Sequence, residues 1–126
     1  MNTTVENNVR IERPSEIPLG NMLHHIQSRT PVYDVLDCLA EESAELTHAA
    51  LKLSRIMHKA LPSPVTLSAA QSAIREELAD VLVCAAACGL IDFDANGSVS
   101  NEAPIRDKVA FKTRRWYERA KELASL

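Results

Sequence analysis

The sequence predicts an all-α fold of four helices, two of them long and central. The chain has 126 residues, only 3 of which are glycine, and aromatic residues make up 4%. Apolar residues recur at the three- and four-residue spacing of a helix face, and no segment shows the strict alternation of a strand. Signals that start and stop helices divide the chain into four such segments. Together these features favour a helical bundle built as one domain.

The N-terminal part of the chain is expected to contain an arm and a first helix. Residues 1–14 are polar and lack periodicity, so we expect them to form a loose arm, with a single domain over 15–126. The first helix is expected over 15–29. Thr30 as N-cap and Pro31 in the first turn are typical signals for the start of a second helix.

The two central helices are expected to be joined by a proline-rich connection. The second helix should continue to about Ala60, where the prolines of 62–64 force a turn. Either Thr66 or Ser68 is expected to begin the third helix, the latter as part of a capping box. This helix should end near Gly89.

The C-terminal part is expected to be a loop followed by a fourth helix. Residues 92–103 contain the turn-forming residues of a loop, and Pro104 is placed in the first turn of the last helix. The loop begins like an EF-hand calcium loop, but its twelfth position is Ala103 where a bidentate glutamate is required. A turn-rich loop is therefore the better interpretation than a calcium site.

Charge is distributed unevenly along the chain. The net charge is -3, which argues against general affinity for nucleic-acid polymers. Residues 30–51 contain five acids and no Lys or Arg, whereas residues 105–121 contain seven of the 14 basic residues. Such segments can hold a cation and a polyanion side by side, or they can be two solvated faces that balance each other. The N-terminus lacks an apolar signal core and no apolar run could span a bilayer, so we expect a cytoplasmic protein without a membrane partner.

Two acidic pairs carry the strongest functional signal. Glu42 and Glu45, and likewise Glu77 and Asp80, lie three residues apart and project from one side of a helix. Helical phasing places Glu42 in the middle of an apolar stripe and the second pair beside small residues. Carboxylates that face an interior are costly unless a cation joins them, and Mg²⁺ prefers oxygen ligands, with Mn²⁺ as the alternative. A single ExxE motif is common on exposed helices, so the prediction depends on the two pairs together.

The combined pattern resembles the MazG-like all-α nucleoside triphosphate pyrophosphohydrolases. Glu41 and Glu42 begin an EExxE motif, and Glu77 and Asp80 form an ExxD motif 31 residues after it, within LAEESAEL and REELADVLV. The resemblance covers roughly residues 36–115. It implies a four-helix MazG-like bundle with two long central helices, completed by association into a homodimer or homotetramer.

The resemblance also implies roles for individual residues. Glu42, Glu45, Glu77 and Asp80 correspond to the Mg²⁺ ligands, and Glu41 to an acid that holds or activates water. On the last helix the family has a lysine, an aromatic residue followed by Asn, and an arginine. The corresponding residues here are Lys108, Phe111, Lys112 and Arg115, so that Lys112 replaces Asn and Phe111 replaces Tyr.

The implied activity is Mg²⁺-dependent hydrolysis of an NTP or dNTP to the monophosphate and pyrophosphate. Lys108, Lys112 and Arg115 are then expected to contact the triphosphate. Two alternatives remain: a non-enzymatic helical interaction module whose acids pair with the basic helix, and a nucleotide-binding sensor of the same fold. The cysteines are expected to be buried thiols that behave as small hydrophobic residues rather than a soft-metal site: Cys38, Cys84 and Cys88.

Overall fold

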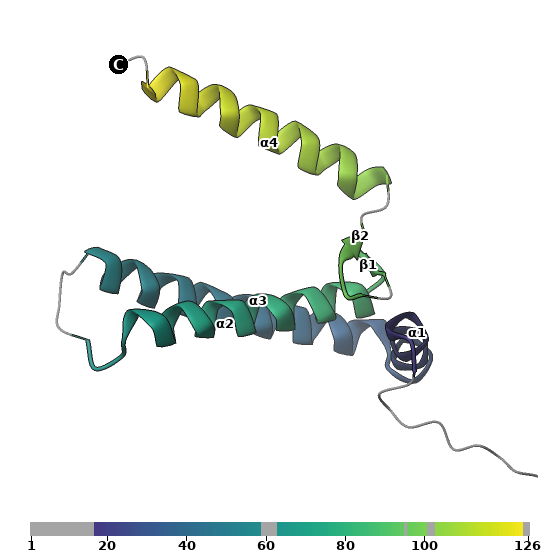
Figure 1. Cartoon of the computed structure of the whole chain (residues 1–126). Coiled ribbons are helices and arrows are strands. Elements are labelled where there is room, and N and C mark those ends of the chain that lie inside the picture. The colour runs from purple at the N-terminus through teal and green to yellow at the C-terminus, as the bar shows by residue number, and fades with distance from the viewer. Residues whose placement is uncertain (1–16, 59–62, 95, 101–102, 125–126) are drawn as a thin grey trace, which may run out of the picture.

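A computed structural model describes residues 17–58, 63–94, 96–100 and 103–124 (Figure 1). The described part contains four helices and a two-stranded sheet, so the predicted all-α class with four helices is confirmed. The predicted arm over 1–14 lies outside the described residues. In chain order the elements are α1 (Leu19–Arg29), α2 (Val32–His58), α3 (Leu67–Ala87), β1 (Asp92–Phe93), β2 (Val99–Ser100) and α4 (Ala103–Ala124).

The boundary between α1 and α2 differs from the prediction. The Thr30 N–H donates to the carbonyl of Ile26 (2.9 Å), so Thr30 ends α1 rather than capping α2. The carbonyl of Pro31 accepts from the N–H of Asp34 (3.0 Å) and α2 begins directly after it. The first helix begins at Leu19, later than predicted.

Both ends of α3 follow local signals. The Thr66 side chain caps the helix, because its Oγ1 accepts a hydrogen bond from the Ala69 N–H (3.1 Å). Of the two predicted starts, Thr66 is therefore correct and Ser68 lies inside the helix. At the other end Gly89 has a φ of +76°, and its N–H donates to the carbonyl of Ala86 (2.9 Å). A left-handed glycine of this kind terminates a helix without strain.

The segment predicted as a plain loop contains a short antiparallel hairpin, β1 paired with β2. One Oδ1 of Asp94 accepts from the N–H groups of Asn96 (2.8 Å) and Ser98 (2.9 Å) and so closes the turn. Gly97 supplies the positive φ (+81°) that the turn requires. The expectation that the chain has no strand is thus wrong for these four residues.

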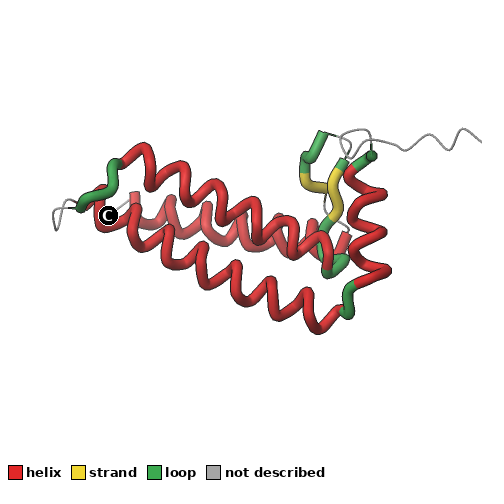
Figure 2. The backbone as a smooth tube through the Cα atoms, turned by 90° about the horizontal axis from the view of Figure 1, so that it is seen from below, coloured by secondary structure: helices red, strands yellow, loops and turns green. Residues whose placement is uncertain are grey.

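The two long helices α2 and α3 lie side by side and antiparallel, and we call them the α2–α3 hairpin (Figures 1 and 2). Their less exposed positions recur every three or four residues, as expected for a helix pair. On α2 these are Val35, Leu39, Glu42, Leu46, Ala49, Leu53 and Ile56, and on α3 they include Ala70, Ile74, Glu77, Val81 and Cys84.

The short helix α1 lies across the end of the hairpin (Figure 1). Its Leu23 is buried, and the Gln27 Nε2 donates to the carbonyl of Ala86 (3.1 Å) at the end of α3. The hydrophobic core of the described residues is small and comprises Leu23, Val35, Ala70 and Ala86.

The last helix, α4, stands apart from the hairpin. It has 22 residues, runs antiparallel to α3 and lies over one broad face of the hairpin, with at most marginal contact with any other described element (Figures 1 and 2). A single chain therefore packs three of the four helices together. No described helix is both long and apolar enough to cross a bilayer.

Candidate metal centre

The interface between α2 and α3 brings three carboxylates together. Glu42 and Glu77 each occupy an interface position, and the antiparallel pairing places them at the same level of the hairpin. Asp80 follows Glu77 by three residues and lies on the same side of α3. One carboxylate oxygen from each of the three lies within 4.8 Å of the other two.

This spacing suits a small divalent cation. Mg²⁺ binds oxygen ligands at about 2.0–2.1 Å, so two ligands on opposite sides of the ion lie about 4.2 Å apart. The separation of up to 4.8 Å is slightly larger, and small side-chain rotations would close the difference. All three donors are hard carboxylate oxygens, which favours Mg²⁺ or Mn²⁺ over metals that prefer sulfur.

The other two predicted acids lie outside this trio. Glu45 is exposed, yet its charge still acts on Glu77, so it lies at the edge of the cluster. Glu41 is also exposed and does not join the trio. Of the four predicted metal ligands, the structure therefore brings Glu42, Glu77 and Asp80 within ligand distance.

The carboxylates are less buried than helical phasing predicts. Glu42 and Glu77 are half-buried, Glu45 and Asp80 are exposed, and no charged side chain is buried among the described residues. The cost of burying unpaired carboxylates therefore does not by itself require a cation in the single chain. A bound cation is favoured instead because the carboxylates of the cluster repel one another.

The pKa of Glu77 is raised above its ordinary value. Partial desolvation is the largest cause, and the charges of Asp80 and Glu42 follow, with smaller contributions from Glu45 and Glu76. Each of these effects disfavours the ionised form. The site is thus short of positive charge in the metal-free chain.

Cys84 borders the same cluster, on the side of α3 that carries Glu77 and Asp80. Its thiol pKa is raised by burial first, then by Cys38 and Glu42, with smaller contributions from Cys88 and Asp80. Cys84 and Cys88 are half-buried as free thiols, but Cys38 is exposed, contrary to the expectation of a buried side chain. Within the described ranges the cysteines do not join a group with metal-ligand spacing.

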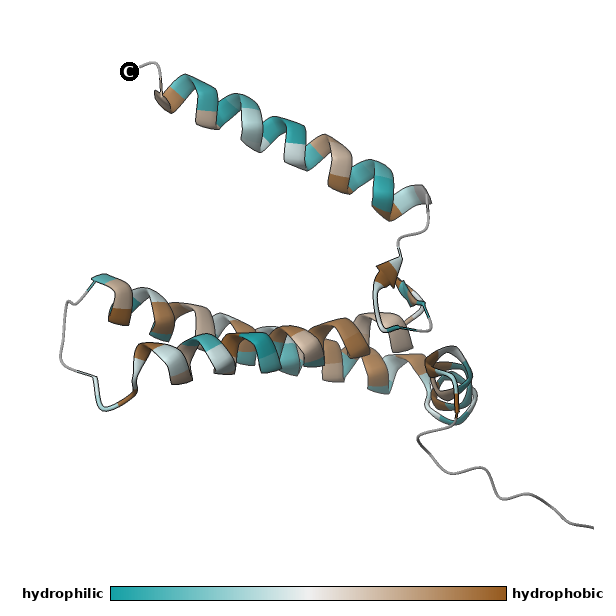
Figure 3. Cartoon of the chain, in the orientation of Figure 1, coloured by the Kyte–Doolittle hydropathy of each residue, from teal (hydrophilic) through white to brown (hydrophobic). Residues whose placement is uncertain are grey.

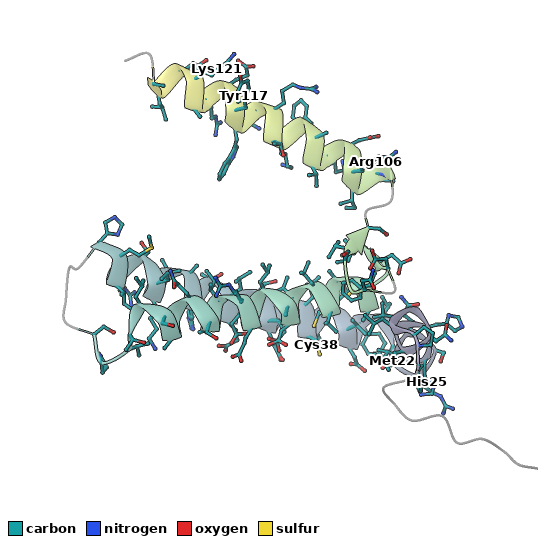
Figure 4. The ribbon with its side chains drawn as sticks, in the orientation of Figure 1. Met22, His25, Cys38, Arg106, Tyr117 and Lys121 are labelled. Carbon is teal, nitrogen blue, oxygen red and sulfur yellow. The ribbon has the colours of Figure 1, made fainter. Side chains whose placement is uncertain are left out.

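The predicted phosphate-binding residues lie on α4, away from the carboxylates. Lys108, Lys112 and Arg115 share one side of this helix and are exposed. Lys108 and Lys112 line a surface hollow whose other residues also belong to α4. Cys38, which shares the carboxylate side of α2, points away from α4 in Figure 4. One chain alone therefore keeps its basic helix on the opposite side of the hairpin from its acids.

Comparison of the chain with family models, curated proteins and solved structures gives no match. The resemblance in the EExxE and ExxD motifs thus remains a prediction, and the function is argued from the site.

Proposed function

We propose that the protein is a Mg²⁺-dependent nucleotide pyrophosphohydrolase of the MazG-like type. It would hydrolyse the α–β phosphoanhydride of an NTP or dNTP, giving the monophosphate and pyrophosphate. The observation that carries the proposal is the trio of Glu42, Glu77 and Asp80, whose oxygens lie within 4.8 Å of one another. These residues also have the spacing of the EExxE and ExxD motifs.

The acids have two roles in this proposal, cation binding and activation of water. Glu42, Glu77 and Asp80 hold the cation, and Glu45 supplies a fourth carboxylate from the edge of the cluster. Glu41 orients the attacking water and accepts its proton. A bound cation would neutralise the triphosphate and stabilise the pyrophosphate leaving group.

The basic residues bind the substrate in the same proposal. Lys108, Lys112 and Arg115 on α4 supply three positive charges along one helix side, which suits the three phosphates of a nucleotide. Since one chain holds them away from the acids, the complete site requires α4 to meet a carboxylate cluster.

The direct test is release of pyrophosphate from a panel of NTPs and dNTPs with Mg²⁺. Loss of a group that orients a metal ligand costs about 10–100-fold in metal affinity or activity, and loss of a direct ligand should cost at least that much. Glu42→Gln and Asp80→Asn should therefore lose turnover and keep the helical circular dichroism spectrum. Asp37→Asn, an exposed acid on α2 outside the cluster, is the matched control. Normal turnover by both cluster variants would contradict the proposal.

A helical interaction module is the second candidate. The observation that favours it is the exposure of large apolar side chains on α4, with Trp116 75% and Leu123 71% exposed. A module of this kind would not be stabilised by Mg²⁺ and would release no pyrophosphate. A nucleotide-binding sensor would instead bind a triphosphate without cleaving it, which calorimetry would detect.

A further inference from the structure

One face of the α2–α3 hairpin, which we call the carboxylate face, carries the acids of the candidate metal centre. The charged residues of α3 all lie between Arg75 and Asp80, in the middle of the helix, where Figure 3 shows its most hydrophilic part. Toward the end of the hairpin where α2 leads into α3, helical spacing places only small residues of α3 on this face, Ala73 and Ala69. Bulky side chains of α3 therefore do not close the carboxylate cluster on that side.

Lys52 of α2 lies on the carboxylate face, in the direction of these small residues. Successive residues of a helix are about 100° apart, so Lys52 lies about 80° from Glu42 around α2, close to Glu45 at about 60°. Arg55 lies about 140° from Glu42, which turns it away from α3, and Arg75 projects from the other side of α3. Within the described parts of α2 and α3, Lys52 is thus the single Lys or Arg on the carboxylate face.

The ammonium group of Lys52 is available to a ligand. Its side chain is exposed, and the one salt bridge in the described part of the chain joins Lys121 to Glu118 on α4. Ion pairs on a helix form between residues three or four apart, whereas Glu45 precedes Lys52 by seven residues, a rise of about 10.5 Å. Lys52 is therefore near the acids without being paired to them.

The position of Lys52 indicates how long such a ligand has to be. Lys52 follows Glu42 by ten residues, which is a rise of about 15 Å along α2. The flexible four-carbon stem of the lysine covers part of this distance. A single phosphate on a cation at Glu42, Glu77 and Asp80 is too short to cover the rest. A chain of phosphates that extends along the carboxylate face is long enough to meet the ammonium group.

We propose that Lys52 binds the terminal phosphate of the substrate and makes the site selective for triphosphates over shorter phosphate chains. This inference rests on the proposed function. The cation would neutralise the phosphates next to the bond that is cleaved, and Lys52 supplies a separate point charge for the γ-phosphate. Because α4 lies on the opposite side of the hairpin from the acids, Lys52 is the positive charge that the hairpin itself contributes.

A purely structural role for Lys52 predicts different behaviour. A lysine that only offsets the repulsion among the acids would change stability or Mg²⁺ affinity, and would weaken the binding of all phosphate chains alike. A lysine that binds the γ-phosphate changes the preference between chains of different length. The preference therefore distinguishes the two roles.

Calorimetry in MgCl₂ with inorganic tripolyphosphate and pyrophosphate as probes measures this preference directly. A hydrogen bond to a charged group contributes about 1.5–3 kcal/mol, so Lys52→Gln should weaken tripolyphosphate binding at least about 10-fold and leave pyrophosphate binding nearly unchanged. Lys52→Arg should retain most of the preference. Arg55→Gln, which removes the same charge from an exposed position of α2 that faces away from α3, should behave as the wild type. Equal weakening of both probes by Lys52→Gln, or a wild type that binds neither probe, would overturn the role of Lys52.

Turnover provides the second measurement. Lys52→Gln should raise the KM for an NTP about 10-fold and change kcat less, because contact with the γ-phosphate is made in the ground state as well as in the transition state. Arg55→Gln should leave KM unchanged. An unchanged KM in Lys52→Gln with an active wild type would contradict the proposal. A wild type that releases no pyrophosphate would refute the proposed function, while the comparison of tripolyphosphate with pyrophosphate would still decide the role of Lys52.

Discussion

Replacing Asp80 by Asn should change stability in opposite directions with and without a divalent cation. In the metal-free protein the substitution removes one of three negative charges that lie within 4.8 Å of one another. With Mg²⁺ bound, the same substitution removes a ligand. The Asp and Asn side chains are similar in size and in helix propensity, so the difference reports mainly on charge and coordination.

The size of both effects follows from the geometry. Two unit charges 4.8 Å apart in water repel by about 0.9 kcal/mol, and physiological salt roughly halves this value. Relief of two such interactions should make the metal-free Asp80→Asn protein more stable than the wild type. With Mg²⁺ at 100 times its dissociation constant, the wild type should gain about 2.7 kcal/mol. A variant that binds 100-fold more weakly should gain only about 0.4 kcal/mol, so the order of stability reverses.

The assay is urea unfolding followed by circular dichroism, in EDTA and in MgCl₂ at matched ionic strength and protein concentration. Asp37→Asn, whose side chain lies outside the cluster, should show the same Mg²⁺ stabilisation as the wild type. An Asp80→Asn protein that is less stable than the wild type in EDTA would refute the repulsion argument. Equal stabilisation of both proteins by Mg²⁺ would refute a metal site at this cluster.

Two further predictions concern pH and the start of α3. The raised pKa of Glu77 means that its stabilising contribution is fully present below the ordinary value of 4.5 and is lost as the pH rises through the folded-state pKa. Between about pH 4 and pH 7 the metal-free wild type should therefore lose stability relative to Glu77→Gln. Urea midpoints measured across this pH range would report the difference. If the midpoints of the two proteins changed in parallel with pH, the raised pKa would be contradicted. Thr66→Ala should destabilise the protein by about 1 kcal/mol, because it removes the cap on the Ala69 N–H, whereas Ser68→Ala should have little effect in the same assay. Equal losses in the two variants would argue against Thr66 as the cap.

Helix boundaries could be predicted from the sequence where a capping residue or proline has only one helix on which to act. Thr66 caps α3 and Pro104 lies in the first turn of α4, because each acts through neighbouring backbone groups. Thr30 was misassigned because it lies between two adjacent helices and could serve either. Its N–H completes α1, and only the tertiary structure shows this choice. Strands of two residues, as in β1 and β2, are too short for any periodic pattern to reveal.

The candidate site was predictable to the extent that helical phase determines it. The spacing within each acidic pair indicated which carboxylates share a side, and the antiparallel hairpin brings Glu42, Glu77 and Asp80 together. Helical phase shows which residues share a face but not whether another element covers that face. The acids were therefore predicted to be more buried than they are. The position of α4 depends on what it packs against, which the sequence of a single chain does not specify.

The exposure of the acids and the lack of packing between α4 and the hairpin have one physical explanation. Only four hydrophobic side chains are buried in the described residues, while seventeen large ones are exposed. A core of this size offsets only part of the conformational entropy lost when the long helices are ordered, so covering further apolar surface would stabilise the fold. Anything that covers the carboxylate face of the α2–α3 hairpin would also exclude water from it. The acids would become buried only when that face is covered, and this burial would strengthen their need for a cation.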